Sequence, residues 1–466
     1  MAKASEGRKK GTPVRDFFAA LGKDIKDIGV TFKEGDWKTR LSFVIFGSGS
    51  LFRGQWLRGI SMVALEAFLL WFIFDFGMPY MSKLSTLGTV ATTKQGRTTV
   101  YGDNSFLILL FGLLGLFAVL AFIFVWRISI RTARNEQMTL AAGKKLPGNK
   151  ADFVSLFDSR FDKTLLALPV TGIFVFTVLP IAFMICVAFT NYDANHQPPS
   201  NLFTWVGLEN FKNLFSFGSS GFGNTFVTVL LWTLVWALFA TFIDYFLGIA
   251  VAMLINKKGI RFKKLWRTIL VVTIAVPQFV SLLYVSKMFA ADGLINGYLK
   301  KWGWIETSIP FWTNPTLAKI TIIVVNIWIG IPYLMLIATG LLMNIPEDLY
   351  ESARIDGASP WQMFRHITMP YMLFVTGPYL LTQYTGNLNN FNVIFLLTRG
   401  EPLTGALQGN AGQTDLLITW LYKMVLNSTN YRMAAVIGIM VFVVTAGISL
   451  VVYQMLPSVK DEEGFQ

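Results

Sequence analysis

FLILLFGLLGLFAVLAFIFVW, the stretch from Phe106 to Trp126, contains no charged residue. A helix needs about 20 mainly apolar residues to cross a hydrocarbon core ~30 Å thick, so this stretch predicts a transmembrane helix. Other long apolar stretches lie on both sides of it. The chain is therefore predicted to be an all-α integral membrane protein with about eight transmembrane helices, near residues 59–81, 104–126, 164–189, 224–254, 268–290, 317–343, 369–396 and 432–456.

The composition agrees with a membrane protein and argues against several other classes. Of the 466 residues, 53% are hydrophobic and 14% are charged, whereas a soluble domain averages roughly 25% charged residues. The net charge of +13 comes from Lys and Arg beside the apolar stretches, which argues for membrane topology rather than for nucleic-acid binding. The one cysteine, Cys186, and the two distant histidines indicate neither a disulfide framework nor a metal site.

The positions of the basic residues predict the orientation. Most of the 40 Lys and Arg residues lie in the tail 1–58 and in the loops after the second and fourth apolar stretches. Since basic loops stay inside, both termini are predicted to be cytoplasmic. The segment 41–59 is too polar to span, and it is either an interfacial amphipathic entry or a positive anchor for the first span. The predicted divisions are a basic tail 1–58, two N-terminal spans 59–163, a transmembrane core 164–456 with spans three to eight, and a tail 457–466.

The loop between the sixth and seventh stretches reads IPEDLYESARIDGASPWQMFRHITMP, residues 345–370. Local chemistry predicts two short helices joined at a turn. Pro346 suits a first helical position, and Gly357 suits a left-handed helix end. Ser359 and Gln362 form a capping-box pattern, and Pro370 marks the return to the membrane. Such structure on the cytoplasmic side indicates a docking surface, although an ordinary helix–turn–helix connector would share these signals.

The loop resembles the EAA motif of binding-protein-dependent ABC permeases at Glu351-Ser-Ala, Gly357-Ala358, Phe364, Ile367 and Pro370. Ser352 and Met369 replace the usual alanine and leucine. The resemblance implies a type I ABC importer permease fold and a coupling helix that sits in a cleft of a separate ATPase. It implies that Glu351 meets a basic residue of that ATPase and that Gly357 permits the turn. The implied coupling residues are Glu351, Ala353, Asp356, Gly357, Ala358, Phe364 and Pro370.

No G-x-x-x-x-G-K-[ST] phosphate loop occurs in the sequence; Gly143-Lys144 lacks the surrounding frame. The chain is therefore predicted to be a non-catalytic subunit without a cofactor of its own. ATP and Mg²⁺ are expected to be bound by partner subunits.

Polar residues within the apolar stretches are candidates for a solute site, because they are costly in a membrane unless they face the protein interior. In the seventh stretch Gln383, Asn387 and Asn390 share one helix face, whereas Asn389 points elsewhere. Asn326, Gly330 and Tyr333 share one face of the sixth. Amides and a tyrosine ring suit uncharged sugars. Hydrogen-bonding glue between helices explains the asparagines equally well.

Asn326–Tyr333, Asn387–Phe391, Leu396–Gly400 and Gln413–Leu417 are similar in order and spacing to the larger-subunit type of maltose/maltodextrin permease. This resemblance implies import of maltodextrin-type oligosaccharides, with raffinose or multiple-sugar transport as the alternative. Gln383 and Gly386 depart from the serine and phenylalanine of the family pattern. The implied sugar-contacting residues are Ile329, Gly330, Tyr333, Gln383, Gly386, Asn387 and Asn390.

The implied partners are a second homologous permease subunit, two ATPase subunits and an extracytoplasmic sugar-binding lipoprotein, in a bacterial cytoplasmic membrane. An ion-coupled secondary transporter would be expected to show paired intramembrane carboxylates or an inverted repeat, and neither is evident. The remaining intramembrane charges, Glu66, Asp75 and Asp244, suggest interior hydrogen bonding more than a proton relay. A membrane-embedded enzyme is disfavoured, because no catalytic constellation is visible.

Overall fold

The computed structural model describes residues 13–95, 97–218, 221–257 and 259–456, and these are mainly helical. The predicted tail 457–466 and residues 1–12 lie outside that range. The chain forms two compact units, Met1–Cys186 with His196–Trp205, and Val187–Asn195 with Val206–Gln466. The division predicted at residues 163 and 164 stays a prediction. Among the described residues the only paired strands form one short hairpin, so the all-α fold is confirmed.

Within the described residues, six helical stretches are long and apolar enough to cross a membrane: Trp56–Met81, Ser105–Ala141, Phe161–Val187, Gly223–Asn256, Pro315–Leu342 and Tyr431–Met455. A seventh candidate is a bent pair of helices, Lys263–Ala275 with Gln278–Met288. These match seven of the predicted stretches. The stretch 369–396 is also helical, but it divides near Asn389 into two helices, and its polar residues make it less apolar than the others.

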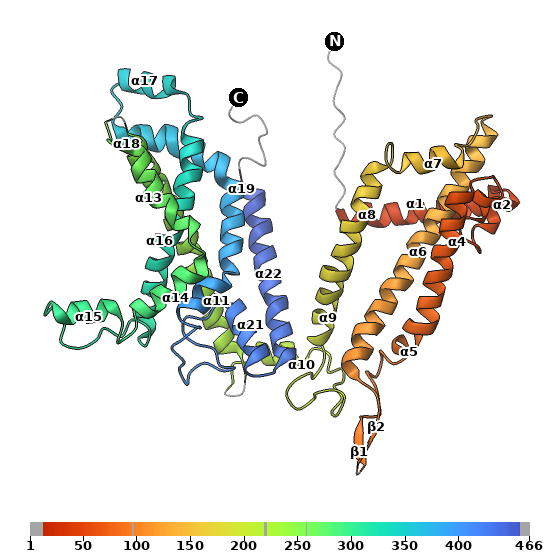
Figure 1. Cartoon of the computed structure of the whole chain (residues 1–466), viewed down its shortest axis with the longest axis horizontal. Coiled ribbons are helices and arrows are strands. Elements are labelled where there is room, and N and C mark those ends of the chain that lie inside the picture. Colours follow the sequence, from red (N-terminus) through yellow and green to blue (C-terminus); the bar gives the residue numbers. More distant parts are fainter. Residues whose placement is uncertain (1–12, 96, 219–220, 258, 457–466) are drawn as a thin grey trace. The chain divides into compact units, whose positions relative to one another are not determined.

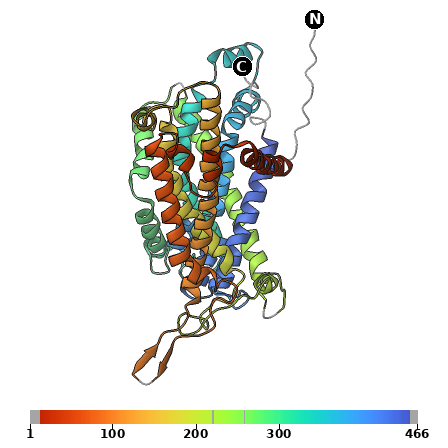
Figure 2. The same cartoon turned by 90° about the vertical axis from the view of Figure 1, so that its right-hand side faces the viewer.

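The first unit contains three of these long helical stretches, Trp56–Met81, Ser105–Ala141 and Phe161–Val187, together with several shorter helices (Figure 1). The hairpin extends past the ends of α5 and α6 (Figure 2). The elements are α1 (Pro13–Glu34), α2 (Trp37–Leu41), α3 (Ser48–Leu51), α4 (Trp56–Trp71), the π-helical η1 (Phe72–Gly77), α5 (Met78–Met81), β1 (Thr93–Gln95), β2 (Thr98–Val100), α6 (Ser105–Ala141), α7 (Asn149–Ser155), α8 (Phe161–Ile173), the π-helical η2 (Phe174–Val178) and α9 (Leu179–Val187), whose last residue belongs to the second unit.

The segment 41–59 folds into turns and α3, and it packs on α6 instead of spanning. The amide of Gly47 donates to the Ser129 hydroxyl at 3.0 Å. Buried Arg53 pairs with Asp36 at 2.6 Å and lies 3.8 Å from Glu136, which also pairs with Arg58 at 3.2 Å. Removing one member of a buried ion pair leaves an uncompensated charge, which is strongly destabilising. This cluster of charges therefore holds the segment 41–59 against α6.

The second unit carries the remaining elements. They are α10 (Glu209–Leu214), α11 (Gly223–Leu238), the π-helical η3 (Phe239–Ile243), α12 (Asp244–Asn256), α13 (Lys263–Ala275), α14 (Gln278–Met288), α15 (Leu294–Lys301), α16 (Pro315–Leu342), α17 (Glu347–Ile355), α18 (Pro360–Met363), the π-helical η4 (Phe364–Thr368), α19 (Met369–Leu388), α20 (Phe391–Leu397), α21 (Leu417–Leu426) and α22 (Tyr431–Met455).

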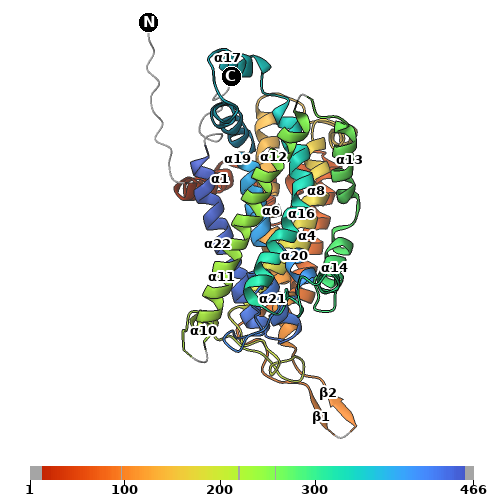
Figure 3. The ribbon, with the colours of Figure 1, turned by 90° about the vertical axis from the view of Figure 1, so that its left-hand side faces the viewer.

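Helices α12 and α16 lie side by side along the centre of this unit (Figure 3). Gly248 makes their close approach feasible: a Cβ atom there would lie 2.7 Å from the Cβ of Leu334. Small residues at helix contacts are the usual means of close packing in a membrane, where the lipid is as apolar as the side chains. Met335 and Met372 are fully buried beside this contact.

Pro277 separates α13 from α14, which meet at 92°. Val276 before it is extended, with ψ 125°, as expected for a residue that precedes proline. Pro332 and Pro378 lie inside the single helices α16 and α19 instead. The break at Pro277 brings the first residue of α14, Gln278, to the polar cavity described below.

Gly248→Ala is expected to lower the stability of the purified protein by about 1–3 kcal/mol, the usual range for overpacking. The added methyl group would meet the side chain of Leu334 and the backbone of Met335 at 3.2 Å. Thermal unfolding in detergent measures the change. Gly340→Ala, on the neighbouring helix α16 and with no atom within 4 Å of the new Cβ, is the matched control. Equal melting temperatures for both variants would contradict the packing argument.

Candidate solute site and coupling loop

A polar cavity of about 240 Å³ lies within the second unit, where η3, α12, α14, α16 and α19 converge. Its wall combines amides, phenol rings and one carboxylate with a few apolar side chains. We call it the polar cavity. Its lining residues are Ala240, Thr241, Asp244, Gln278, Asn326, Ile329, Gly330, Tyr333, Leu334, Tyr379, Leu380, Gln383, Asn387 and Asn390.

Six of the seven residues that the sequence assigned to sugar contact line this cavity: Ile329, Gly330, Tyr333, Gln383, Asn387 and Asn390. The seventh, Gly386, lies on α19 with an exposed Cα and does not line it. Asn389 is exposed and points elsewhere, as expected. The structure thus gathers residues from two distant stretches around one space, while their role in binding stays a prediction.

Asn387 holds three elements together at the edge of the polar cavity. Its side-chain amide donates to the Thr241 hydroxyl of η3 at 3.0 Å, and its side-chain oxygen accepts from Asn390 at 3.2 Å. Its backbone oxygen accepts from the Trp236 indole at 3.2 Å. Asn390 in turn caps α20 by accepting from the amide of Val393. The asparagines therefore do connect helices, and they do so in the wall of a cavity.

Other polar groups that line the polar cavity form no hydrogen bond within the described residues. The side chains of Gln383 and Gln278 make no hydrogen bond to any residue that the structure describes. The hydroxyl of Tyr379 is buried, and within the same residues it too has no partner. Because a buried polar group without a partner is costly, the Tyr379 hydroxyl marks a place where a ligand gains by binding. Half-buried Gln383 and exposed Gln278 present amide groups to the same cavity.

Sequence reasoning overlooked four polar contributors to this wall: Thr241, Asp244, Gln278 and Tyr379. Asp244 was noted as an intramembrane charge, but nothing in the sequence linked it to Asn326. Gln278 follows the proline that breaks a span, and this is a usable signal because interrupted membrane helices often line sites. Thr241 and Tyr379 give no signal, since threonine and tyrosine are common in membrane helices.

The loop 345–370 contains the two predicted helices. α17 ends in a Schellman arrangement: the Ala358 amide donates to the carbonyl of Ala353 at 2.9 Å, and Gly357, with φ +79°, donates to Arg354 at 3.1 Å. Ser359 and Gln362 form the predicted reciprocal capping box. Pro346 precedes α17 as its N-cap instead of occupying the first helical position.

This loop is exposed at one end of the second unit (Figure 1). The side chain of Glu351 faces outward, and none of the residues of α17 is buried. The Tyr350 hydroxyl lies 2.8 Å from the Thr368 hydroxyl, so α17 is fastened to η4. The implied coupling residues are distributed as Glu351 and Ala353 in α17, Asp356, Gly357 and Ala358 in the turn, Phe364 in η4 and Pro370 in α19.

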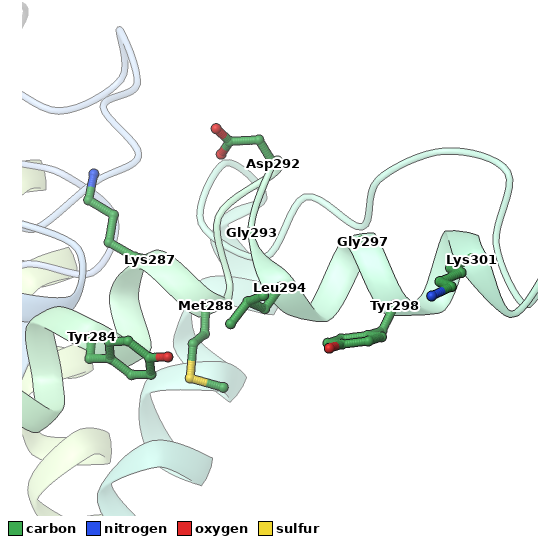
Figure 4. Close-up of a pocket in the computed structure, with 9 residues that line it drawn as sticks. All are labelled: Tyr284, Lys287, Met288, Asp292, Gly293, Leu294, Gly297, Tyr298 and Lys301. Carbon is green, nitrogen blue, oxygen red and sulfur yellow. The ribbon is translucent and has the colours of Figure 1, made fainter.

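Two further hollows in the second unit suit a sugar less well. A groove of about 390 Å³ runs beside α14 and α15, and its side chains spread along the two helices instead of converging (Figure 4). A larger hollow of about 990 Å³ between α11, α19 and α22 is lined almost entirely by apolar side chains such as Leu373 and Phe242.

Long apolar helices around a polar cavity define a multi-pass membrane protein with a candidate solute site. Residues 244–460 match the family described as "binding-protein-dependent transport system inner membrane component". The chain is 34% identical over 434 residues to the maltodextrin transport system permease protein MdxF of Bacillus subtilis, covering 91% of this chain and 97% of that one.

The galactooligosaccharides transport system permease protein GanP of the same organism is also 34% identical, over 422 residues, 90% of this chain and 97% of GanP. A crystal structure of a bacterial ABC transporter that imports the acidic polysaccharide alginate contains a chain with the same fold. It has a TM-score of 0.52 at 22% identity, over 66% of this chain and 99% of that one. The present chain belongs to the family of permease subunits of binding-protein-dependent ABC importers.

Asn387→Leu is expected to destabilise the protein by about 1 kcal/mol or more, because the Thr241 hydroxyl and the Asn390 amide lose their partner. Gln383 lines the same cavity, but its replacement by leucine breaks no hydrogen bond within the described residues. The melting temperature of the Gln383→Leu variant should therefore stay near that of the parent. Thermal unfolding of the two purified variants measures the difference. A larger loss for Gln383→Leu than for Asn387→Leu would refute this account of the network.

Proposed function

We propose that this chain is the permease subunit through which a neutral oligosaccharide of the maltodextrin type crosses the cytoplasmic membrane of a bacterium. The observation that carries the proposal is the polar cavity. Gln383 and the Tyr379 hydroxyl, which have no hydrogen-bond partner among the described residues, line it together with the exposed ring of Tyr333. Amides and hydroxyls pair with sugar hydroxyls, and an aromatic ring packs on the apolar face of a pyranose. The relation to MdxF supports a maltodextrin, and that to GanP keeps other oligosaccharides as the alternative.

The proposal includes the partners that complete such an importer. A homologous permease subunit forms the other half of the pathway, a sugar-binding lipoprotein delivers the sugar, and two ATPase subunits bind ATP and Mg²⁺. No ATP-binding loop is present in this sequence, so hydrolysis takes place on the ATPase subunits. Both termini and the loop 345–370 face the cytoplasm. In support, Leu456 after α22 and Pro370 at the end of this loop line the same apolar hollow between α11, α19 and α22. The end of the last helix therefore lies near the loop.

The test is reconstitution of the four components in proteoliposomes, with uptake of maltotriose, raffinose and a β-galactotriose measured with and without ATP. ATP-dependent uptake of maltotriose above the other two sugars is the expected result. In the same assay Gln383→Leu should lower maltotriose uptake about tenfold, since one or two hydrogen bonds to the ligand are lost. Uptake by this chain without any ATPase, or no uptake of any oligosaccharide, would refute the proposal.

Glu351→Lys tests the coupling role. Reversing an exposed charge on α17 should place like charges together where the ATPase docks, and like charges across an interface oppose binding. ATPase copurification and ATP-dependent uptake should both be lost. Glu306→Lys, an equally exposed glutamate in the loop between α15 and α16, is the matched control and should retain both. Normal copurification and uptake in Glu351→Lys would exclude this role.

A further inference from the structure

Asp244 is a buried carboxylate in the wall of the polar cavity. It lies inside the span Gly223–Asn256, directly after the π-helical segment η3, and only 4% of its surface is exposed. Charged groups within membrane spans are expensive, and they persist where they have a function or a partner. π-Helical turns inside helices are also frequent at functional sites.

Among the described residues, one oxygen of the Asp244 carboxylate has a hydrogen-bond partner and the other has none. Oδ2 accepts a hydrogen bond from the Asn326 amide at 2.9 Å. Oδ1 is buried and has no hydrogen-bond partner among the described residues, and no Lys or Arg of that part of the chain pairs with Asp244. A buried acceptor without a hydrogen bond is costly, so a donor from a bound ligand would stabilise Oδ1.

Gly330 on α16 makes room for the carboxylate. A Cβ atom at Gly330 would lie 2.1 Å from Oδ2 and 2.8 Å from Cγ of Asp244, distances that no real contact allows. Only glycine at this position lets the carboxylate rest against α16 and reach Asn326, one helical turn away. The carboxylate is therefore held in place by two residues of one helix, both of which line the polar cavity.

We infer that Asp244 is a specificity-determining residue, whose carboxylate accepts a hydrogen bond from a hydroxyl of a neutral saccharide and repels anionic saccharides. The inference rests on the proposed function and adds a substrate distinction to it. A hydroxyl group supplies the donor that Oδ1 lacks, and hydrogen bonds to a charged acceptor are stronger than those between neutral groups. A uronate in the same space would bring a second negative charge close to Asp244 in a low-dielectric wall.

Two other roles for Asp244 fit the surroundings less well. If Asp244 served only to hold α12 against α16, an asparagine could accept the hydrogen bond from Asn326 equally well. A purely structural role therefore does not account for a charged side chain whose second oxygen has no partner among the described residues. A metal site would need several ligands, and the described residues contain no group of three His, Cys, Asp or Glu side chains that could hold an ion. The amides around Asp244 are instead suited to hydroxyl groups.

The test uses the assembled transporter of permease and ATPase subunits in nanodiscs, without the binding protein, whose own selectivity would obscure that of the permease. Equilibrium binding is measured for maltotriose and for maltotriose with its non-reducing end oxidised to a uronate. The parent is expected to bind maltotriose about tenfold or more tightly than the uronate. Asp244→Asn should bring the two affinities near parity, and Asp244→Ala should weaken maltotriose binding about tenfold.

Glu66→Gln is the matched control. Glu66 is likewise buried in a membrane span, but it accepts from the Phe46 amide at 2.8 Å and does not line the polar cavity, so the preference for maltotriose should be retained. An unchanged preference in Asp244→Asn overturns the inference. Equal binding of both sugars by the parent does the same, even if Asp244→Asn fails to assemble. A parent that neither binds nor imports any neutral oligosaccharide instead refutes the proposed function.

Discussion

The second unit depends on one constraint: a polar side chain inside a membrane helix must find its hydrogen bonds within the protein or in what the protein binds. Asn387 meets this constraint, since its side-chain nitrogen, its side-chain oxygen and its backbone oxygen each have a partner. Asp244, Tyr379 and Gln383 meet it in part or not at all within the described residues. The contrast separates the groups that build the cavity wall from those that remain for a solute.

Glycine makes the wall feasible at two positions along the same pair of helices. Gly248 on α12 lets Leu334 approach, and Gly330 on α16 lets the Asp244 carboxylate approach, so each helix gives up a side chain where the other needs space. Both contacts lie within a few turns of each other on α12 and α16. The close packing at Gly248 and the placement of the Asp244 carboxylate at Gly330 therefore depend on the same distance between α12 and α16. A substitution that separates the two helices at one of these contacts also displaces the residues at the other.

Local features were predictable from the sequence, and contacts between distant segments were not. The capping box at Ser359 and the left-handed Gly357 depend on neighbours in the chain, and both occur as predicted. The shared faces of Gln383 with Asn387 and of Gly330 with Tyr333 follow from helical periodicity, and all four residues line the cavity.

The pairing of Asp244 with Asn326 joins residues far apart in the sequence, and no periodicity indicates it. The break after Asn389 was also missed, because an asparagine-rich stretch reads equally well as a continued helix or as a cap. Asn390 therefore reaches the cavity as the N-cap of α20 and not as a residue of the seventh predicted span. Gly386, which lies outside the lining, was assigned to sugar contact by the family resemblance and not by helical spacing.

The helix that begins in the exposed loop also forms a wall of the cavity, and this continuity gives the proposed coupling a physical route. From Pro360 the chain runs as helix through α18, η4 and α19 to Leu388 without a break. At 1.5 Å per residue, Gln383 lies roughly 20 Å along that helix from Pro370. Tyr350 fastens α17 to its start through Thr368, and Asn387 fastens its end to η3. A displacement of α17 by a docked ATPase would therefore reach Gln383 along one continuous helix, and the hydrogen bond from Asn387 would pass it on to Thr241 of η3.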